Sequence, residues 1–239
     1  MLDIDGLSVH VGGQAVLDGV TTRVENGQLV YLLGRNGTGK TTLLKAICGV
    51  LPVTGGRILI DGRPFAELPA PPQVLGMHLG TDAAHPGHTA RRHLTWLARA
   101  GGIPVSQVDE VLELVHLSDV ARRRVVDFSL GMRQRLGIAA ALLGDARTLI
   151  LDEPVNGLDI DGIRWLRTLL RNLADSGRSL LIASHHLDEV ARTADRVIVL
   201  DSGRIAADAP VDEFIAGHAD LEGAYLAAVS DPSTAGAVR

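Results

Sequence analysis

Eight consecutive residues near the start of the chain have the types and spacing of a phosphate-binding loop. The segment GRNGTGKT, residues 34–41, fits G-x-x-x-x-G-K-[ST] between the strand-like run QLVYLL and the helix-like run TLLKAICGVL. Glycines at these spacings let backbone N–H groups turn toward phosphate oxygens, and the start of a helix adds partial positive charge. We expect Lys40 to reach the outer phosphates of a nucleoside triphosphate and the Thr41 hydroxyl to ligate Mg²⁺.

The lysine at position 40 stands out against the composition of the chain. Of its 23 basic residues only two, Lys40 and Lys45, are lysines, so 23 − 2 = 21 are arginines. A lysine kept under such a bias indicates a place for a compact ammonium group, where a planar guanidinium would not fit.

Two adjacent carboxylates supply the second element of a hydrolytic site. Asp152 and Glu153 end the buried strand pattern TLILDEP, and such an end lies at the carboxyl edge of a parallel sheet, beside a phosphate loop. Asp152 is expected to hold the metal or one of its waters, and Glu153 to take the proton of an attacking water. The alternative is a charged strand end that leads into a proline turn.

The elements that must position these residues alternate between strand and helix. Before residue 34, LDIDGLSVHV and VLDGVTTRVENGQLVYLL alternate apolar and polar residues, and Asn26-Gly27 is a turn between two strands, which favours an antiparallel edge. Helical spacing runs from about 89 to 144, and alternation returns from TLILDEP onward. The pattern predicts an α/β fold: a mostly parallel sheet with an antiparallel edge and a helical subdomain inserted at about 86–144. We expect one domain over 1–229 and a disordered tail over 230–239.

Composition and charge exclude several classes of protein. The chain has 239 residues and a formal charge of −5, which argues against a nucleic-acid partner held by phosphate contacts. No apolar run approaches the ~18 residues of a membrane-spanning helix, and the N-terminus is acidic where a signal peptide would be basic. The one cysteine, Cys48, lies in an apolar pattern and is expected to be buried. A cytoplasmic protein is expected.

Five motifs, GRNGTGKT, FSLGMRQR, LILDEP, NGLD and SHH, occur in an order and spacing that resemble the nucleotide-binding subunit of an ATP-binding cassette (ABC) transporter. This resemblance covers nearly the whole chain. It implies a P-loop NTPase that binds ATP and Mg²⁺ and hydrolyses ATP to power a separate transmembrane permease. It also implies a partner, a second nucleotide-binding subunit in a homodimer, and a peripheral location on the cytoplasmic face of the membrane through the permease.

The resemblance assigns roles to residues outside the phosphate loop. Ser129 and Gly131 match the family signature, which closes over the nucleotide held by the partner chain; the alternative for Ser129 is a plain helix cap. Asp159 matches a loop that crosses the dimer interface, and His185 matches the histidine that contacts the γ-phosphate and orients water with Glu153. The expected nucleotide-binding residues are Gly34, Arg35, Asn36, Gly37, Thr38, Gly39, Lys40, Thr41, Thr42, Ser129, Gly131 and Asp159, with Lys40, Glu153 and His185 as catalytic residues and Thr41 and Asp152 as metal ligands.

Phe128, Leu130 and Met132 depart from the family signature, and two positions elsewhere depart from the family pattern. Val11 stands where an aromatic residue would stack on adenine, and Gly80 stands where a glutamine would link the metal to the membrane subunit. The nearby residues His78, His85, His88 and His93 match no compact zinc spacing, and we interpret them as part of a polar surface loop.

Three functions compete. HPGHTARRHLTWLARAGGI, SLGMRQRL and EPVNGLD resemble the branch that serves drug, antibiotic and peptide exporters. A soluble cassette protein acting on the ribosome or DNA usually has tandem cassettes or long coiled coils, whereas this chain has one cassette and net negative charge. A small GTPase or a kinase would share only the phosphate loop, and the guanine-reading N-K-x-D motif is missing from the sequence.

Overall fold

The computed structural model describes residues 1–81 and 84–230. The strands are β1 (Leu2–Val11), β2 (Gln14–Val24), β3 (Leu29–Leu33), β4 (Gly55–Ile60), β5 (Leu75–His78), β6 (Thr148–Asp152), β7 (Ser179–Ala183), β8 (Arg196–Asp201) and β9 (Arg204–Pro210). The helices are α1 (Lys40–Ile47), α2 (Pro71–Val74), α3 (Ala90–Ala100), α4 (Gln107–Leu114), α5 (Leu130–Leu142), α6 (Ile160–Asp175), α7 (Leu187–Thr193), α8 (Val211–Ile215) and α9 (Leu221–Ser230). Short 3₁₀ turns are η1 (Phe65–Glu67), η3 (Ser118–Val120) and η4 (Val125–Asp127).

The central sheet has the order β5-β6-β7-β3-β8-β9 and is parallel except for its edge strand β9. Because β3, β6 and β7 are parallel neighbours, their carboxyl ends meet at one edge of the sheet. That edge carries the phosphate loop after β3, the two carboxylates after β6 and the histidine pair after β7.

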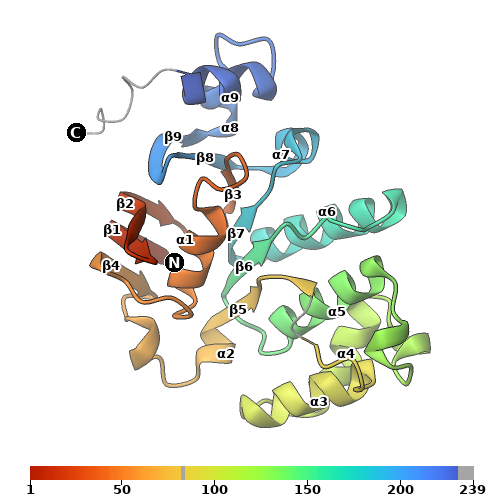
Figure 1. Ribbon diagram of the computed structural model, residues 1–239. Helices are drawn as coiled ribbons and strands as arrows, with labels where there is room; N and C mark the ends of the chain where they lie inside the picture. The colour runs from red at the N-terminus through yellow and green to blue at the C-terminus, as the bar shows by residue number, and fades with distance from the viewer. Residues whose placement is uncertain (82–83, 231–239) are drawn as a thin grey trace.

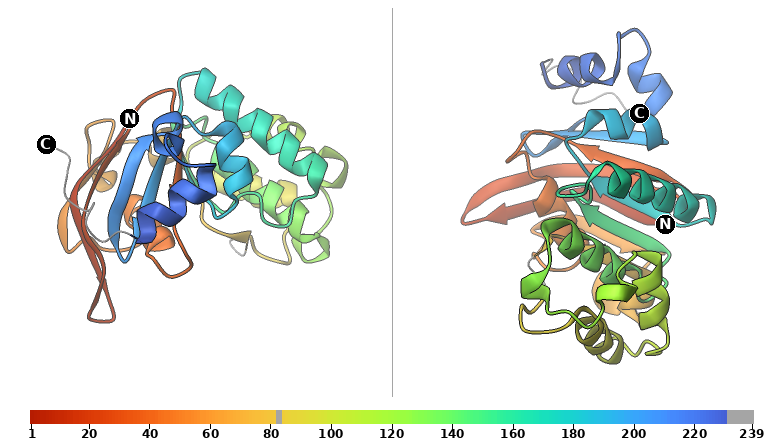
Figure 2. Two further views of the ribbon diagram at one scale, coloured as in Figure 1. Left: turned by 90° about the horizontal axis from the view of Figure 1, so that it is seen from above. Right: turned by 90° about the vertical axis from the view of Figure 1, so that its right-hand side faces the viewer.

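Both faces of the central sheet are buried, and alternate residues of each strand face opposite layers. In β3, Leu29, Tyr31 and Leu33 belong to the apolar cluster that includes α5 and α6, whereas Val30 and Leu32 belong to the cluster that includes α1 and the antiparallel strands. This is why β3 reads as a continuous apolar run. Figure 2 shows the antiparallel strands and the helices on either side of this sheet.

The prediction for Cys48 is confirmed. The thiol lies in the cluster with α1, and burial raises its pKa to about 12, so the group stays protonated and unreactive.

The connection at Asn26-Gly27 differs from the expectation. It joins β2 to β3, but these strands do not pair: β2 belongs to a separate antiparallel sheet of order β2-β1-β4. The antiparallel hairpin lies earlier in the chain and joins β1 to β2. Its turn is formed by Gly12 and Gly13, whose φ angles of 59° and 82° suit a two-residue hairpin turn. A mixed sheet was expected, and the structure has it, but β1 and β2 form a separate sheet with β4, which follows the phosphate loop.

The helices α3, α4 and α5 fall within the segment predicted to be helical and lie together beyond β5 (Figure 1). The helix α5 returns toward the sheet and packs against β5. The sequence patterns did not indicate β9, α8 or α9. The helix α9 ends at Ser230, the first residue of the predicted tail, and residues 231–239 lie outside the described residues.

Candidate functional site

The phosphate loop runs from the end of β3 to the start of α1 and turns around the Lys40 side chain. Lys40 is 7% exposed, and its Nζ donates hydrogen bonds to the carbonyl oxygens of Gly34 at 2.6 Å and Arg35 at 3.2 Å. Gly39 has a φ of 108°, a conformation that disfavours any side chain. The loop therefore encloses an ammonium group at the helix N-terminus, as the lysine bias predicted.

The first carboxylate of the pair lies against the start of α1. The Thr41 hydroxyl donates a 2.8 Å hydrogen bond to Asp152 Oδ2. Burial raises the pKa of the Asp152 carboxyl, the Thr41 hydrogen bond opposes this rise, and the neighbouring Glu153 adds to it. Two adjacent oxygen donors, one of them a poorly hydrated carboxylate, fit the preference of Mg²⁺ for oxygen ligands.

The second carboxylate lies beside a histidine from the next strand. Glu153 Oε2 lies 2.8 Å from Nδ1 of His185, and the Glu153 N–H donates to the carbonyl of Ala183 at 2.9 Å. The backbone of Glu153 has a φ of 50°, a left-handed conformation that costs a non-glycine residue of order 1 kcal/mol or more and is typical of functional sites. Strand pairing thus brings together two of the three predicted catalytic residues.

Two polar residues that sequence reasoning missed surround Glu153. The side chain of Gln134, 2% exposed, donates from Nε2 to the Glu153 carbonyl oxygen at 2.9 Å. The backbone N–H of Asn156 donates to the same oxygen at 3.2 Å. Gln134 lies one turn after Leu130 on α5. The i, i+4 spacing of these two residues inside FSLGMRQR was therefore the signal that could have placed Gln134 on the same face of the helix as Leu130.

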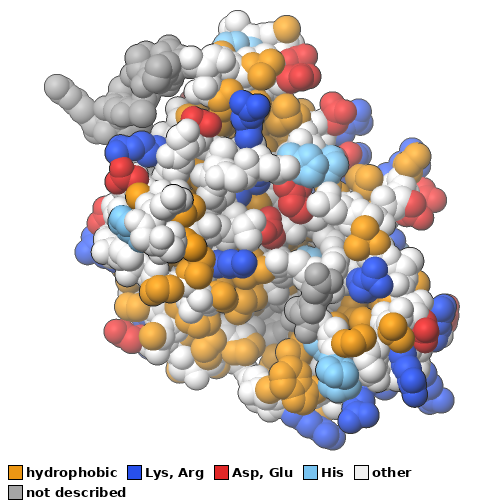
Figure 3. Space-filling view, in the orientation of Figure 1, with side chains coloured by type: hydrophobic (Ala, Val, Ile, Leu, Met, Phe, Trp, Pro, Cys, Tyr) orange, Lys and Arg blue, Asp and Glu red, His pale blue; other side chains and the backbone are white. Residues whose placement is uncertain are grey.

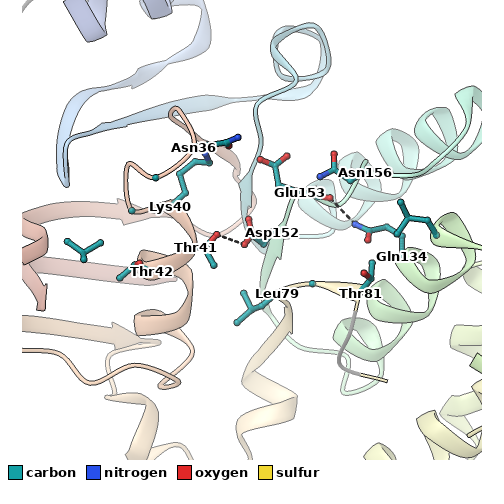
Figure 4. A pocket seen from close by; sticks show the side chains of 15 residues that line it. Asn36, Lys40, Thr41, Thr42, Leu79, Thr81, Gln134, Asp152, Glu153 and Asn156 are labelled. Carbon is teal, nitrogen blue, oxygen red and sulfur yellow. Dashed lines mark hydrogen bonds between the residues drawn. The ribbon is translucent and has the colours of Figure 1, made fainter. Parts of the chain in front are cut away.

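A cavity of ≈ 520 Å³ opens beside these groups (Figure 4). Its lining includes many of the predicted residues, from the phosphate loop, the start of α1 and the end of β6. The lining residues are Val16, Asn36, Gly37, Gly39, Lys40, Thr41, Thr42, Leu79, Gly80, Thr81, Leu130, Gln134, Asp152, Glu153 and Asn156. The predicted residues Gly34, Arg35 and Thr38 lie in the loop behind this lining, where the N–H of Thr38 bonds to the carbonyl of Arg35.

Three predicted residues belong to helix starts rather than to this lining. The Ser129 hydroxyl accepts a 3.2 Å hydrogen bond from the N–H of Met132 and caps α5. Asp159 caps α6 by accepting from the N–H of Gly162 at 2.8 Å. Gly131 packs against the loop after β6, where a Cβ would lie 2.7 Å from the carbonyl oxygen of Gly157.

The interpretation of the four histidines as a polar surface loop is wrong for two of them. His78 ends β5 and is 3% exposed, and His93, in α3, is 6% exposed. Both side chains are buried because β5, which carries His78, and α3, which carries His93, pack against α5. Of the two departing positions, Val11 is exposed at the end of β1, and Gly80 lines the cavity.

Comparison with known proteins settles the family. Residues 17–156 match the family described as ABC transporter. The chain belongs to the ABC transporter family. Members of this family bind and hydrolyse ATP through this domain, so the protein is an ABC ATPase.

Curated relatives of this ABC ATPase are named for transport of bacitracin, for transport of a lantibiotic and for import of Fe(3+) ions. The bacitracin transport ATP-binding protein BcrA of Bacillus licheniformis is 39% identical over 212 residues, which cover 86% of this chain and 68% of the relative. The lantibiotic transport ATP-binding protein SrtF of Streptococcus pyogenes is 32% identical over 212 residues, 89% and 92% of the two chains. The Fe(3+) ions import ATP-binding protein FbpC of Streptomyces coelicolor is 34% identical over 243 residues, 96% and 70% of the two chains.

A solved structure agrees with the fold of the ABC ATPase. The ATP-binding subunit of an ABC transporter superposes with a TM-score of 0.87 at 29% identity, over 95% of this chain and 99% of that one. The fold prediction of a P-loop NTPase with a mostly parallel sheet and inserted helices is confirmed. Within residues 1–81 and 84–230, no helix is long and apolar enough to cross a membrane.

Proposed function

We propose that the protein hydrolyses Mg²⁺-ATP in the cavity at the carboxyl edge of the central sheet. One observation carries this proposal: the segments that follow β3, β6 and β7 place Lys40, Thr41, Asp152, Glu153 and His185 at a single edge of the sheet. At this edge Thr41 contacts Asp152, and Glu153 contacts His185. The phosphate-binding, metal-binding and proton-accepting groups of the proposed site thereby adjoin one cavity.

Each side chain has a role that its position supports. The amides of the phosphate loop and Lys40 bind the β- and γ-phosphates. Thr41 and Asp152 would hold Mg²⁺, which neutralises charge on the phosphate oxygens when it is bound. Glu153 accepts the proton of the attacking water, and His185 holds the Glu153 carboxylate in place and contacts the γ-phosphate. Gln134 and Asn156 fix the backbone from which Glu153 projects.

The partners follow from residues that do not line this chain's own cavity, although Leu130, between two of them, does. Ser129, Gly131 and Asp159 are separate from its lining, which suits a homodimer in which they complete the site of the second subunit. A separate transmembrane permease would use the energy of the cycle and hold the protein at the cytoplasmic face of the membrane.

The cargo is proposed to be a drug, an antibiotic or a peptide that is exported. The names of BcrA and SrtF, for bacitracin and lantibiotic transport, support an antibiotic or a peptide as the cargo. Import is the second candidate, because FbpC aligns over 96% of this chain at a similar identity. A soluble cassette acting on ribosome or DNA has less support, since the relatives described above are named for transport.

Replacement of Glu153 by glutamine tests the chemistry. Glutamine keeps the size of the side chain but accepts no proton, so hydrolysis by Glu153→Gln should fall by the ~10²–10⁴-fold typical of a lost general base. ATP binding should remain within about twofold, because the phosphate loop is unchanged. Phosphate release and equilibrium binding of the purified variant measure the two quantities, and unchanged turnover would remove Glu153 from this role.

The same variant distinguishes export from import in cells. A cell that depends on this ATPase for export should become more sensitive to the exported peptide antibiotic when Glu153→Gln replaces the native chain. Loss of growth on limiting Fe³⁺, with unchanged antibiotic sensitivity, would favour import instead.

A further inference from the structure

Three metal-binding side chains converge at the strand ends beside the cavity. Glu153 follows β6, and His185 and His186 follow β7; each offers a ligand atom, and these three atoms lie within 4.8 Å of one another. Figure 3 shows histidine and acidic side chains side by side on this face of the molecule. The proposed role of His185 in hydrolysis leaves His186 without a function.

The spacing of the three ligands suits a tetrahedral ion. Bonds of about 2.0–2.2 Å at tetrahedral angles place ligand atoms about 3.4 Å apart. Glu153 Oε2 and His185 Nδ1 are now 2.8 Å apart, so they would separate by roughly half an ångström to admit an ion. The other separations among the three ligand atoms, at most 4.8 Å, would have to shorten by up to about 1.4 Å, and all three side chains lie at loop positions.

The hydrogen bonds around the cluster leave ligand atoms available. Oε2 of Glu153 is enclosed by protein, yet within the described part of the chain it receives no aligned hydrogen bond despite the short distance to His185. Nε2 of His186 lies 3.1 Å from Asn156 Oδ1, an acceptor, so Nε2 carries the proton and the Nδ1 lone pair is free. Such a second hydrogen bond commonly orients a histidine that ligates a metal. The two imidazole rings lie against each other, with centroids 4.1 Å apart and planes tilted by 34°, so the two side chains are side by side.

We propose that Glu153, His185 and His186 form an inhibitory site for Zn²⁺ or a similar borderline transition ion. Two imidazoles and one carboxylate match the His₂Glu donor sets that bind zinc, whereas the neighbouring Thr41 and Asp152 offer only oxygen, which suits Mg²⁺. The two sites therefore select different ions. Zn²⁺ at this cluster would occupy the carboxylate that accepts the proton and the histidine beside it, so it would stop hydrolysis. Only this inhibitory consequence rests on the proposed function; binding of the ion does not.

The experiment measures metal binding apart from activity. The full chain without nucleotide is titrated with Zn²⁺ in equilibrium dialysis and with Co²⁺ as a visible-absorbing substitute. Wild type should bind one ion per chain with the strong absorption of four-coordinate Co²⁺. Loss of an outer-shell partner costs 10–100-fold in affinity, so His186→Asn, which loses a direct ligand, should bind roughly 10-fold more weakly or worse. His88→Asn is the matched control, because His88 pairs with His85 at a ring distance of 4.9 Å elsewhere on the chain and should leave the affinity unchanged.

Hydrolysis of Mg²⁺-ATP with added Zn²⁺ is then measured on the same three proteins. The Zn²⁺ concentration for half-inhibition should follow the binding constant and rise by the same factor in His186→Asn. Equal affinity of wild type and His186→Asn, or a six-coordinate Co²⁺ spectrum, would overturn the site. Tight binding without inhibition would overturn its inhibitory role. Absence of hydrolysis in every protein, with metal binding as expected, would instead count against the proposed function.

Discussion

Among the single residues of this chain, His78 has an environment that its neighbours in the sequence do not predict. Its ring is 3% exposed between β5 and α5, and burial lowers its pKa below the ordinary 6.5, although the nearby polar side chain of Gln134 partly opposes the shift. In the part of the chain that the structure describes, Nε2 of His78 has no hydrogen-bond partner. The folded protein therefore holds a neutral imidazole that the unfolded chain would protonate in mild acid.

This difference predicts a pH dependence of stability. Below pH 6.5 the unfolded chain binds a proton at His78 that the folded chain does not bind. The contribution of the neutral His78 to the free energy of unfolding is therefore complete above pH 6.5 and is lost as the pH falls toward the lowered pKa. Within that window His78→Leu should reduce the slope of unfolding free energy against pH by up to about 1.4 kcal/mol per pH unit. Urea unfolding between pH 5 and 8 measures it. The exposed His218 supplies a control, since His218→Gln should leave the slope as in wild type; an equal slope for His78→Leu would contradict the argument.

At the scale of elements, the contact of α5 with β5 depends on the absence of side chains. A Cβ at Gly137, in the interior of α5, would overlap the His78 ring, and a Cβ at Gly76, in β5, would overlap the Ala141 carbonyl. These glycines let the helix approach the strand closely. The same helix carries Ser129 at its start and Gln134 against Glu153, so this contact helps to set the distance between Ser129 and Glu153, the proposed general base.

The cost of filling this contact can be predicted by weighing two effects. Gly137→Ala gains about 1 kcal/mol of helix propensity but introduces an overlap that costs about 1–3 kcal/mol in a packed interior. Because the His78 ring is buried and cannot swing aside, we expect net destabilisation. In the background His78→Ala the overlap is gone, so the same substitution should stabilise the protein. A double-mutant cycle by chemical unfolding measures this coupling, and a stabilising Gly137→Ala in wild type would show that α5 moves freely on β5.

At the scale of the whole molecule, Ser129, a proposed phosphate-binding residue, lies outside the lining of the cavity at the phosphate loop, although Leu130 and Gln134 of α5 belong to that lining. The phosphate loop lines one cavity, and Ser129 lies at the start of α5, outside that lining. A homodimer would pair each loop with the Ser129 of the other chain. A helix cap alone accounts for Ser129 equally well within a single chain, so only an experiment on two chains distinguishes the two interpretations.

Mixing two inactive variants provides that experiment. Ser129→Asp preserves the cap, since aspartate caps helices well, but places a carboxylate against the γ-phosphate of a partner. Glu153→Gln lacks the base. Their heterodimer would contain one site with the native loop, the native base and the native Ser129, so hydrolysis in the mixture should exceed the sum of the separate variants. Phosphate release across mixing ratios measures the recovery.

Folding and binding controls make the mixture interpretable. Ser129→Asp should keep the melting temperature and the ATP affinity of the monomer. Gly131→Asp would be less clean, because a Cβ there meets the Gly157 carbonyl of the same chain at 2.7 Å. If the activity of the mixture only equals the sum of the two variants at concentrations where wild type dimerises, Ser129 acts as an ordinary helix cap and does not complete the partner's site.

The sequence by itself determined the elements whose conformation depends on near neighbours. The glycine and lysine spacing of residues 34–41, the apolar run that ends in Asp152 and Glu153, and the helical spacing of α3 to α5 all appear in the structure where the patterns placed them. The family followed from the order of the motifs and is confirmed. The roles of the individual site residues remain predictions that the proposed experiments address.

Only the tertiary structure decided which distant residues meet. Asn26-Gly27 has the composition of a hairpin turn, yet β3 pairs with β7 and β8, because a strand apolar on both faces is stabilised at the centre of a covered sheet. The burial of His78, the bond from Gln134 to Glu153 and the meeting of Glu153 with His185 likewise join residues from different elements. Local patterns encode backbone conformation and which face is apolar, whereas strand order and helix packing depend on contacts between segments far apart in the chain.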